Sequence, residues 1–167
     1  LFYSRFKKGI RWEYAPESWS VTEQRDPDIK GWNVATVLEA YKGGLPLFRK
    51  HIRSTAPLGI WYEGRGETNN NTIPHNTHMS YAYALLLAAR MRKRISMLDW
   101  GGGVGHYYEF SKVLDPQLEI EYHYRDLPIA SEYVRSAFPE AHVYTDDSCL
   151  NRTYDFILAT AVIHYMQ

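Results

Sequence analysis

The feature that most constrains the fold of this chain is the run MLDWGGGVG at residues 97–105, where an apolar segment reaches an acid and four glycines then fill five positions. Glycine is the residue that loses most conformational freedom on folding. Such a cluster therefore indicates a backbone that turns sharply or approaches a ligand closely. The apolar run ISMLDW before it is typical of a short buried strand, and HYYEFSKVLD after it predicts a helix. The sequence predicts a strand, a glycine turn and a helix in that order.

Downstream of the glycines, strand and helix patterns continue to alternate. IEYHYRDL, residues 120–127, places Ile120, Tyr122 and Tyr124 on one face of a second strand, and Pro128 opens a helical stretch. AHVYTDD (141–147) and YDFILATAVIHYM (154–166) predict two more strands. Upstream, the helix expected in MSYAYALLLAARMRK begins at a cap on Asn76 or Thr77 and ends on basic residues. This order predicts an α/β, Rossmann-like and mostly parallel sheet with flanking helices.

The N-terminal half has a different character and predicts a helical and loop segment. Four of the five tryptophans lie within residues 1–75, and one periodic stretch, GWNVATVLEAY, predicts a helix that Gly43, Gly44 and Pro46 would end. The polar run GRGETNNNTIPHN, residues 64–76, is typical of a loop. We therefore expect a cap segment over residues 1–75 and a Rossmann-like domain over residues 76–167.

Composition narrows the classes of partner. Nineteen basic residues balance nineteen acidic ones, so no overall field favours nucleic acid or a membrane surface. The longest apolar run, AYALLLAA, is far too short to cross a bilayer. A single cysteine, Cys149, excludes an internal disulfide and favours a reducing, cytoplasmic setting. His75 and His78 have metal-like spacing but no carboxylate or cysteine beside them, so no metal site is expected.

The spacing of the glycines separates two kinds of nucleotide site. Asp99, Gly101, Gly103 and Gly105 follow the pattern acid, any, Gly, any, Gly, any, Gly. A nicotinamide-binding turn would place its third glycine at position 106, which is a histidine. The glycine spacing therefore disfavours a nicotinamide-dependent oxidoreductase. A tight turn that binds no ligand is the structural alternative.

The stretch DWGGGVG resembles the first motif of class I S-adenosylmethionine-dependent methyltransferases. The resemblance covers residues 76–167 and includes the YRDLP turn, the YTDD segment and the apolar run that starts at Tyr154. It implies that S-adenosylmethionine is the cofactor, that Asp99 acts on its methionine end and that Asp126 holds the ribose hydroxyls. It also implies that Asp146 or Asp147 meets the adenine amino group. The tryptophan-rich start and LDWGGGVGHYY further resemble methyltransferases associated with surface-polysaccharide gene clusters.

The same resemblance implies about three more strands beyond the fourth, so the sheet is expected to be incomplete in this chain. The expected reaction is methyl transfer to a small or carbohydrate-linked hydroxyl. His164 is the first candidate for a general base, with His106, Tyr107, His75 and His78 as others. A non-catalytic methyltransferase-like binding module stays open as the second hypothesis, and under either hypothesis the chain could form an oligomer.

Each assigned residue also has a structural alternative. Asp126 is placed to cap the helix that opens at Pro128, and Asp146 and Asp147 are common turn residues. A histidine at a strand end, such as His164, is often a hydrogen-bonded neighbour without a chemical role.

Overall fold

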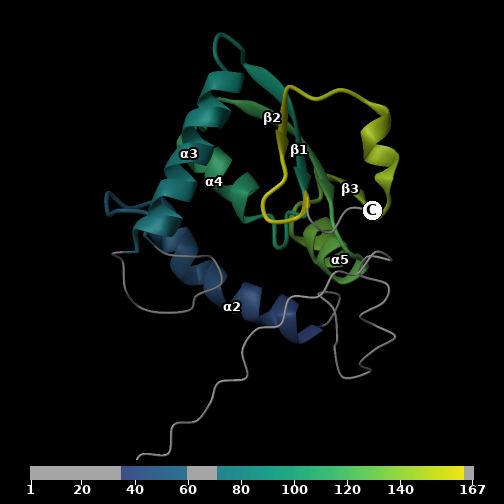
Figure 1. Cartoon of the computed structure of the whole chain (residues 1–167), viewed down its shortest axis with the longest axis horizontal. Helices are drawn as coiled ribbons and strands as arrows, with labels where there is room; N and C mark the ends of the chain where they lie inside the picture. The colour runs from purple at the N-terminus through teal and green to yellow at the C-terminus, as the bar shows by residue number, and fades with distance from the viewer. Residues whose placement is uncertain (1–34, 60–70, 164–167) are drawn as a thin grey trace, which may run out of the picture.

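The structure, a computed structural model, describes residues 35–59 and 71–163 and contains helices around one parallel sheet (Figure 1). The helices are α2 (Ala35–Ile52), α3 (Thr72–Ala88), α4 (His106–Leu114), α5 (Pro128–Ala137) and the short 3₁₀ helix η1 (Asp147–Asn151). The strands are β1 (Arg94–Trp100), β2 (Glu119–Arg125), β3 (His142–Tyr144) and β4 (Phe156–Leu158). His164 and residues 64–70 of the expected loop lie outside the described residues.

The sheet confirms the α/β, Rossmann-like prediction. Its order is β3-β2-β1-β4 with every pair parallel, and Asp99 lies in register with Tyr124 on one side and Leu158 on the other. Parallel strands run in one direction, so the ends of β1 and β2 meet at one edge of the sheet. The glycine turn and Asp126 both leave the sheet at that edge.

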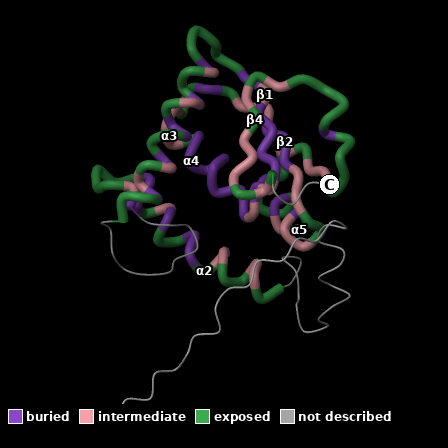
Figure 2. Tube along the Cα trace, viewed as in Figure 1, coloured by how far each residue is buried: buried purple, intermediate pink, exposed green. Residues whose placement is uncertain are grey.

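One face of the sheet carries the main core. Residues from α2, α3, α4 and α5 join β1 and β2 in one buried cluster, and Figure 2 shows the burial concentrated in β1, β2 and α4. Tyr122 is central to it, since its ring stacks on Tyr108 with centroids 4.0 Å apart. The opposite face holds a smaller cluster of Leu98, Trp100 and Cys149, the last from η1. Within the described residues, no α-helix covers that opposite face.

Helix α2 corrects the prediction that Gly43, Gly44 and Pro46 end the first helix. The helix runs from Ala35 to Ile52 with Pro46 inside it. Leu45, Phe48 and Ile52 recur at helical spacing and are buried in the protein. Their burial outweighs the local preference of glycine and proline to break a helix.

Helix α3 begins and ends earlier than predicted. It starts at Thr72, because Asn71 rather than Asn76 or Thr77 supplies the cap and accepts a hydrogen bond from the Ile73 N–H at 3.0 Å. The helix ends at Ala88, so the basic residues that follow lie outside it. Met91 has a φ of 63° and turns the chain toward β1.

The last two strands are shorter than their sequence patterns predicted. β3 covers three residues of the 141–147 segment, and the 3₁₀ helix η1 takes up its end. β4 covers Phe156–Leu158 out of the 154–166 run. Apolar character alone thus overestimated strand length where each strand pairs on one side only, as β3 does with β2 and β4 does with β1 among the described residues.

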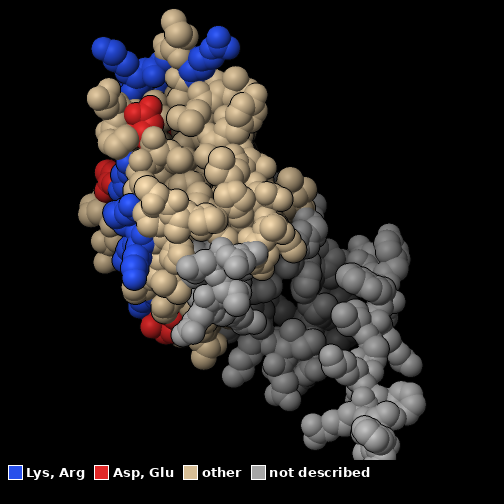
Figure 3. All heavy atoms as spheres, turned by 90° about the vertical axis from the view of Figure 1, so that its left-hand side faces the viewer, with Lys and Arg blue, Asp and Glu red and all other residues tan. Residues whose placement is uncertain are grey.

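Helix α3 also presents an apolar outer surface. The side chains of Met79, Tyr83, Leu86 and Leu87 are exposed, and their spacing places them on one face of the helix. Figure 3 shows this side of the molecule as largely free of charged side chains. Within the described residues, no helix is long and apolar enough to span a membrane.

Candidate functional site

The glycine run forms a tight turn between β1 and α4, as predicted. Gly101, Gly103 and Gly105 have φ angles of 73°, 56° and 70°, a region that residues with a Cβ rarely occupy. The Gly101 N–H donates to the Arg125 carbonyl at 2.7 Å, and the Gly105 N–H donates to the Gly102 carbonyl at 2.9 Å. The turn is therefore tied both to itself and to the end of β2.

Close packing around the turn gives a second reason for glycine. A Cβ on Gly102 would lie 2.5 Å from Asp99 Oδ2 and 2.8 Å from the Tyr124 ring. A Cβ on Gly105 would lie 2.7 Å from the Phe138 ring. Backbone, acid and aromatic rings thus approach one another more closely here than side chains would allow.

Asp99 lies beneath the turn and is fully buried. The Tyr122 hydroxyl donates to its Oδ2 at 2.9 Å, whereas Oδ1 has no hydrogen-bond partner among the described residues. Burial raises the pKa of Asp99 to about 7, and the nearby charge of Asp126 acts in the same direction. The Tyr122 hydrogen bond acts in the opposite direction and lowers this pKa. Asp99 is therefore a carboxyl group poised between its neutral and ionised forms near neutral pH.

Asp126 joins the glycine turn to the start of α5. Its Oδ2 accepts from the Gly103 N–H at 2.7 Å and its Oδ1 accepts from the Leu127 N–H at 2.6 Å. Burial raises the pKa of Asp126, while these two N–H groups act in the opposite direction. The Tyr124 hydroxyl and the charge of Arg125 also lower the pKa of Asp126. The cap expected as the structural alternative is not formed, because Leu127 is the N-cap residue of α5 and no side chain caps the helix; Asp126 instead holds the Leu127 N–H just before it.

Two tyrosines, Tyr122 and Tyr124, complete the site, although their sequence pattern predicted only that they share one face of a strand. Tyr122 binds Asp99, and the Tyr124 hydroxyl donates to the Gly103 carbonyl at 2.6 Å. Their alternation in IEYHYRDL predicted correctly that they point to the same side. Their hydroxyl groups could have indicated a place in the site, because a buried tyrosine hydroxyl needs a hydrogen-bond partner.

Asp146 and Asp147 lie one strand further along the edge. Asp146 caps η1 and accepts from the Ser148 N–H at 3.0 Å. Asp147 pairs with Arg125 at 3.0 Å, and the Arg125 guanidinium lies 5.5 Å from the centre of the Trp100 ring. Both acids thus have structural contacts, and the Arg125 pair connects Asp147 to the ends of β1 and β2.

His106 and Tyr107, two candidate bases, begin α4 and are buried. Burial keeps the pKa of His106 well below its usual value, and the charge of His78 acts in the same direction. Burial also raises the pKa of Tyr107 to about 12. At neutral pH both groups are therefore uncharged parts of an aromatic cluster, in which the two rings lie 4.2 Å apart.

His75 and His78 connect α3 to the segment after α2. His75 Nδ1 accepts from the Leu58 N–H at 3.1 Å, and His78 Nδ1 lies 3.2 Å from the Leu58 carbonyl. Burial lowers the pKa of His78. The two histidines therefore connect α3 to Leu58 through hydrogen bonds.

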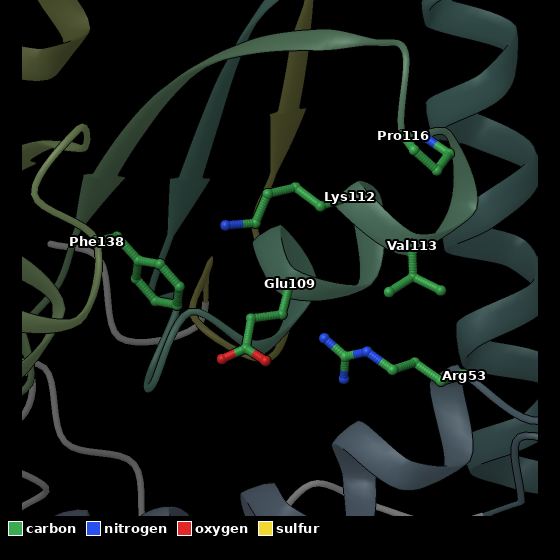
Figure 4. Close-up of a pocket in the computed structure, with 6 residues that line it drawn as sticks. All are labelled: Arg53, Glu109, Lys112, Val113, Pro116 and Phe138. Carbon is green, nitrogen blue, oxygen red and sulfur yellow. The ribbon is translucent and has the colours of Figure 1, made fainter.

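A shallow hollow of about 430 Å³ lies away from the glycine turn, on the outer side of α4 (Figure 4). Its lining residues are Arg53, Glu109, Lys112, Val113, Pro116 and Phe138. The Glu109 carboxylate that borders it is held by Arg49 through two hydrogen bonds of 2.7 and 2.5 Å. The hollow is thus separate from the acids and glycines at the strand ends, apart from Phe138, which packs beside Gly105.

Comparison with known proteins gives matches among solved structures and none by sequence. No protein-family profile matches the chain, and no curated protein matches its sequence. Among solved structures, the chain is similar to coclaurine N-methyltransferase bound to N-methylheliamine and SAH, with 16% sequence identity and a TM-score of 0.35. The similarity covers 75% of this chain and 43% of that one, so the chain spans less than half the length of that enzyme.

Proposed function

We propose that this chain binds S-adenosylmethionine at the ends of β1 and β2 and belongs to a methyltransferase that acts on a small or carbohydrate-linked hydroxyl. The observation that carries the proposal is the Asp126 carboxylate, which accepts from the Gly103 N–H of the glycine turn. A nucleoside ligand at the edge of a parallel sheet meets a close backbone and an acid in this arrangement. The resemblance of DWGGGVG and YRDLP to class I methyltransferases agrees with it.

The residues present fit such a ligand. The Asp126 carboxylate stands beside the glycine turn, where it can accept from a ribose hydroxyl, and the turn leaves the backbone open to a close approach. Asp99 has one buried oxygen with no hydrogen-bond partner among the described residues, which suits a positively charged group at the methionine end. We assign the adenine contact to Asp146 or Asp147, which stand at the next strand end.

The chemistry asked of the protein is mainly positioning. S-adenosylmethionine supplies a methyl group already activated by its sulfonium centre, so the residues must hold the acceptor in line with it and exclude water. A hydroxyl acceptor gains from a base with a pKa near neutrality. We retain His164 for that role, because His106 and His78 are buried with lowered pKa values.

The acceptor class rests on the sequence after β4. That segment reads ATAVIHY and lacks the Asn/Asp-Pro-Pro-aromatic run of several amino-methylating enzymes. A hydroxyl acceptor, in a cytoplasmic pathway that builds surface polysaccharide, is the proposal that follows. The alternative of a non-catalytic binding module predicts ligand binding without methyl transfer.

Calorimetric titration of the chain with S-adenosylmethionine, S-adenosylhomocysteine and NAD tests the proposal. We expect micromolar binding of the first two and none of NAD. Binding of NAD alone would favour the oxidoreductase, and no binding at all would contradict the proposed site.

Substitution of Asp126 locates the ligand. Asp126→Ala should weaken binding of S-adenosylhomocysteine by roughly tenfold or more, because it removes charge-assisted hydrogen bonds. It also removes the Gly103 and Leu127 contacts, so stability has to be measured in parallel. Asp115→Ala is the matched control, since Asp115 accepts from the Gln117 N–H at 3.0 Å near the opposite edge of the sheet. Equal affinities in the two variants would remove Asp126 from the site.

A further inference from the structure

Three potential metal ligands meet on the sheet face that no described α-helix covers. Glu121 and His123 lie two residues apart on β2, and His142 of β3 is the register partner of His123. Ligand atoms from all three residues lie within 4.8 Å of one another. The group is separate from the glycine turn and from Asp126.

The three residues differ in burial in a way that leaves one side of the group open. His123 is fully buried, Glu121 is half-buried and His142 is exposed. An ion can therefore reach the group from solvent at His142, while the sheet holds His123 in place.

Tyr144 supplies the outer support that metal-binding histidines usually have. His123 Nε2 lies 2.9 Å from Glu121 Oε1, and His123 Nδ1 lies 3.1 Å from the Tyr144 hydroxyl. If the ring proton of His123 is on Nδ1, that N–H can donate a hydrogen bond to the Tyr144 oxygen. Nε2 then has a free lone pair with which to bind a cation. Such a partner fixes the tautomer and the orientation of the ring.

The Glu121 carboxylate already binds two cationic side chains. Arg152 donates to its Oε1 at 3.0 Å, and Arg94 donates to its Oε2 at 3.3 Å. Both arginine side chains are about half exposed and can move into solvent. A divalent ion would compete with them for the same carboxylate.

We propose that Glu121, His123 and His142 form a binding site for one divalent transition-metal ion, with Zn²⁺ as the first probe. Two imidazoles and a carboxylate are ligands that zinc accepts, and water fills the fourth position of such a site. The inference does not depend on methyl transfer.

One side chain has to move for the site to close. Ligand atoms around tetrahedral zinc lie roughly 3.4 Å apart, given bonds of about 2.1 Å. The rings of His123 and His142 are stacked, with centroids 4.5 Å apart and planes inclined by 14°. His142 is exposed, so its ring can rotate toward the ion while the buried His123 stays in place.

Titration of the metal-free chain with Zn²⁺, followed by calorimetry and by thermal unfolding, tests the site. We expect one ion per chain and a rise in the unfolding temperature. His142→Ala and Glu121→Gln should each weaken binding by roughly tenfold or more, since losing even an outer partner costs that much. Co²⁺ bound to the chain should give a visible absorption band that His142→Ala abolishes.

Two further variants separate this site from adventitious binding. Glu119→Gln is the matched control, because Glu119 is on the same strand and also pairs with Arg94 but is not one of the three ligands. It should leave the Zn²⁺ affinity unchanged, whereas Arg152→Gln should raise it by removing a competing cation. Zn²⁺ affinity that is the same in His142→Ala as in the unaltered chain would overturn the proposal, as would the absence of saturable binding.

Discussion

The buried acid beneath the glycine turn gives a prediction whose size can be worked out. Asp99 is fully buried, and its pKa rises from 3.8 to about 7 on folding. Between these values the folded protein holds a proton that the unfolded chain has lost, so this group's contribution to stability falls as pH rises. At 1.36 kcal/mol per pKa unit, the whole difference is roughly 4 kcal/mol, of which more than half is lost between pH 5 and pH 8.

Asp99→Asn removes the titration while its side-chain oxygen can still accept from Tyr122. We expect the free energy of unfolding of this variant, relative to the unaltered chain, to rise by roughly 2–3 kcal/mol from pH 5 to pH 8. Urea unfolding at several pH values measures it, and the buried histidines titrate in both proteins and cancel in the difference. Asp155→Asn is the control, because hydrogen bonds from Ser96 hold the pKa of Asp155 below its usual value. Parallel curves for Asp99→Asn and the unaltered chain would refute this reasoning.

Three further predictions concern packing and charge. Gly102→Ala should destabilise the fold by about 1–3 kcal/mol in urea unfolding, because the added Cβ would clash with Asp99. Gly43→Ala, in open space within α2, should instead stabilise the fold, and equal effects of the two substitutions would contradict the packing argument. Arg49→Met should lower the free energy of unfolding by about 1–3 kcal/mol, because it leaves the buried Glu109 without its hydrogen-bond donors. Lys42→Met, which breaks the exposed pair with Glu39, should lower it by less than about 0.5 kcal/mol, and equal losses would contradict the role given to burial. The contribution of His78 and His106 to stability should fall as pH drops below 6.5, against that of Asp99, because burial lowers their pKa values and the unfolded chain then binds more protons. His106→Gln should therefore gain stability relative to the unaltered chain as pH falls, and parallel pH curves in urea unfolding would contradict it.

Much of the fold was predictable because its signals are local. The alternation of strand and helix patterns predicted the parallel sheet, and the acid and glycines of DWGGGVG predicted the turn after β1. The continuation of α2 past Pro46 was not predictable, because it depends on the burial of Phe48 and Ile52 against other elements. Local propensity is a weak guide where tertiary packing decides.

The site was predictable only in part for the same reason. Asp126 stands where the sequence placed it, yet its bond to Gly103 depends on how β2 lies beside β1. The metal-ligand group was missed because His142 meets His123 only through the register of two strands. Strand register brings together residues far apart in the sequence, and no spacing rule reveals it.

Amide hydrogen exchange with and without S-adenosylhomocysteine tests the proposed donor site most directly. The account predicts slower exchange in residues 99–105 and 124–128, at the ends of β1 and β2. It predicts no change in residues 114–119, near the opposite edge of the sheet. Protection confined to the hollow beside α4, or no protection anywhere at saturating ligand, would contradict the account.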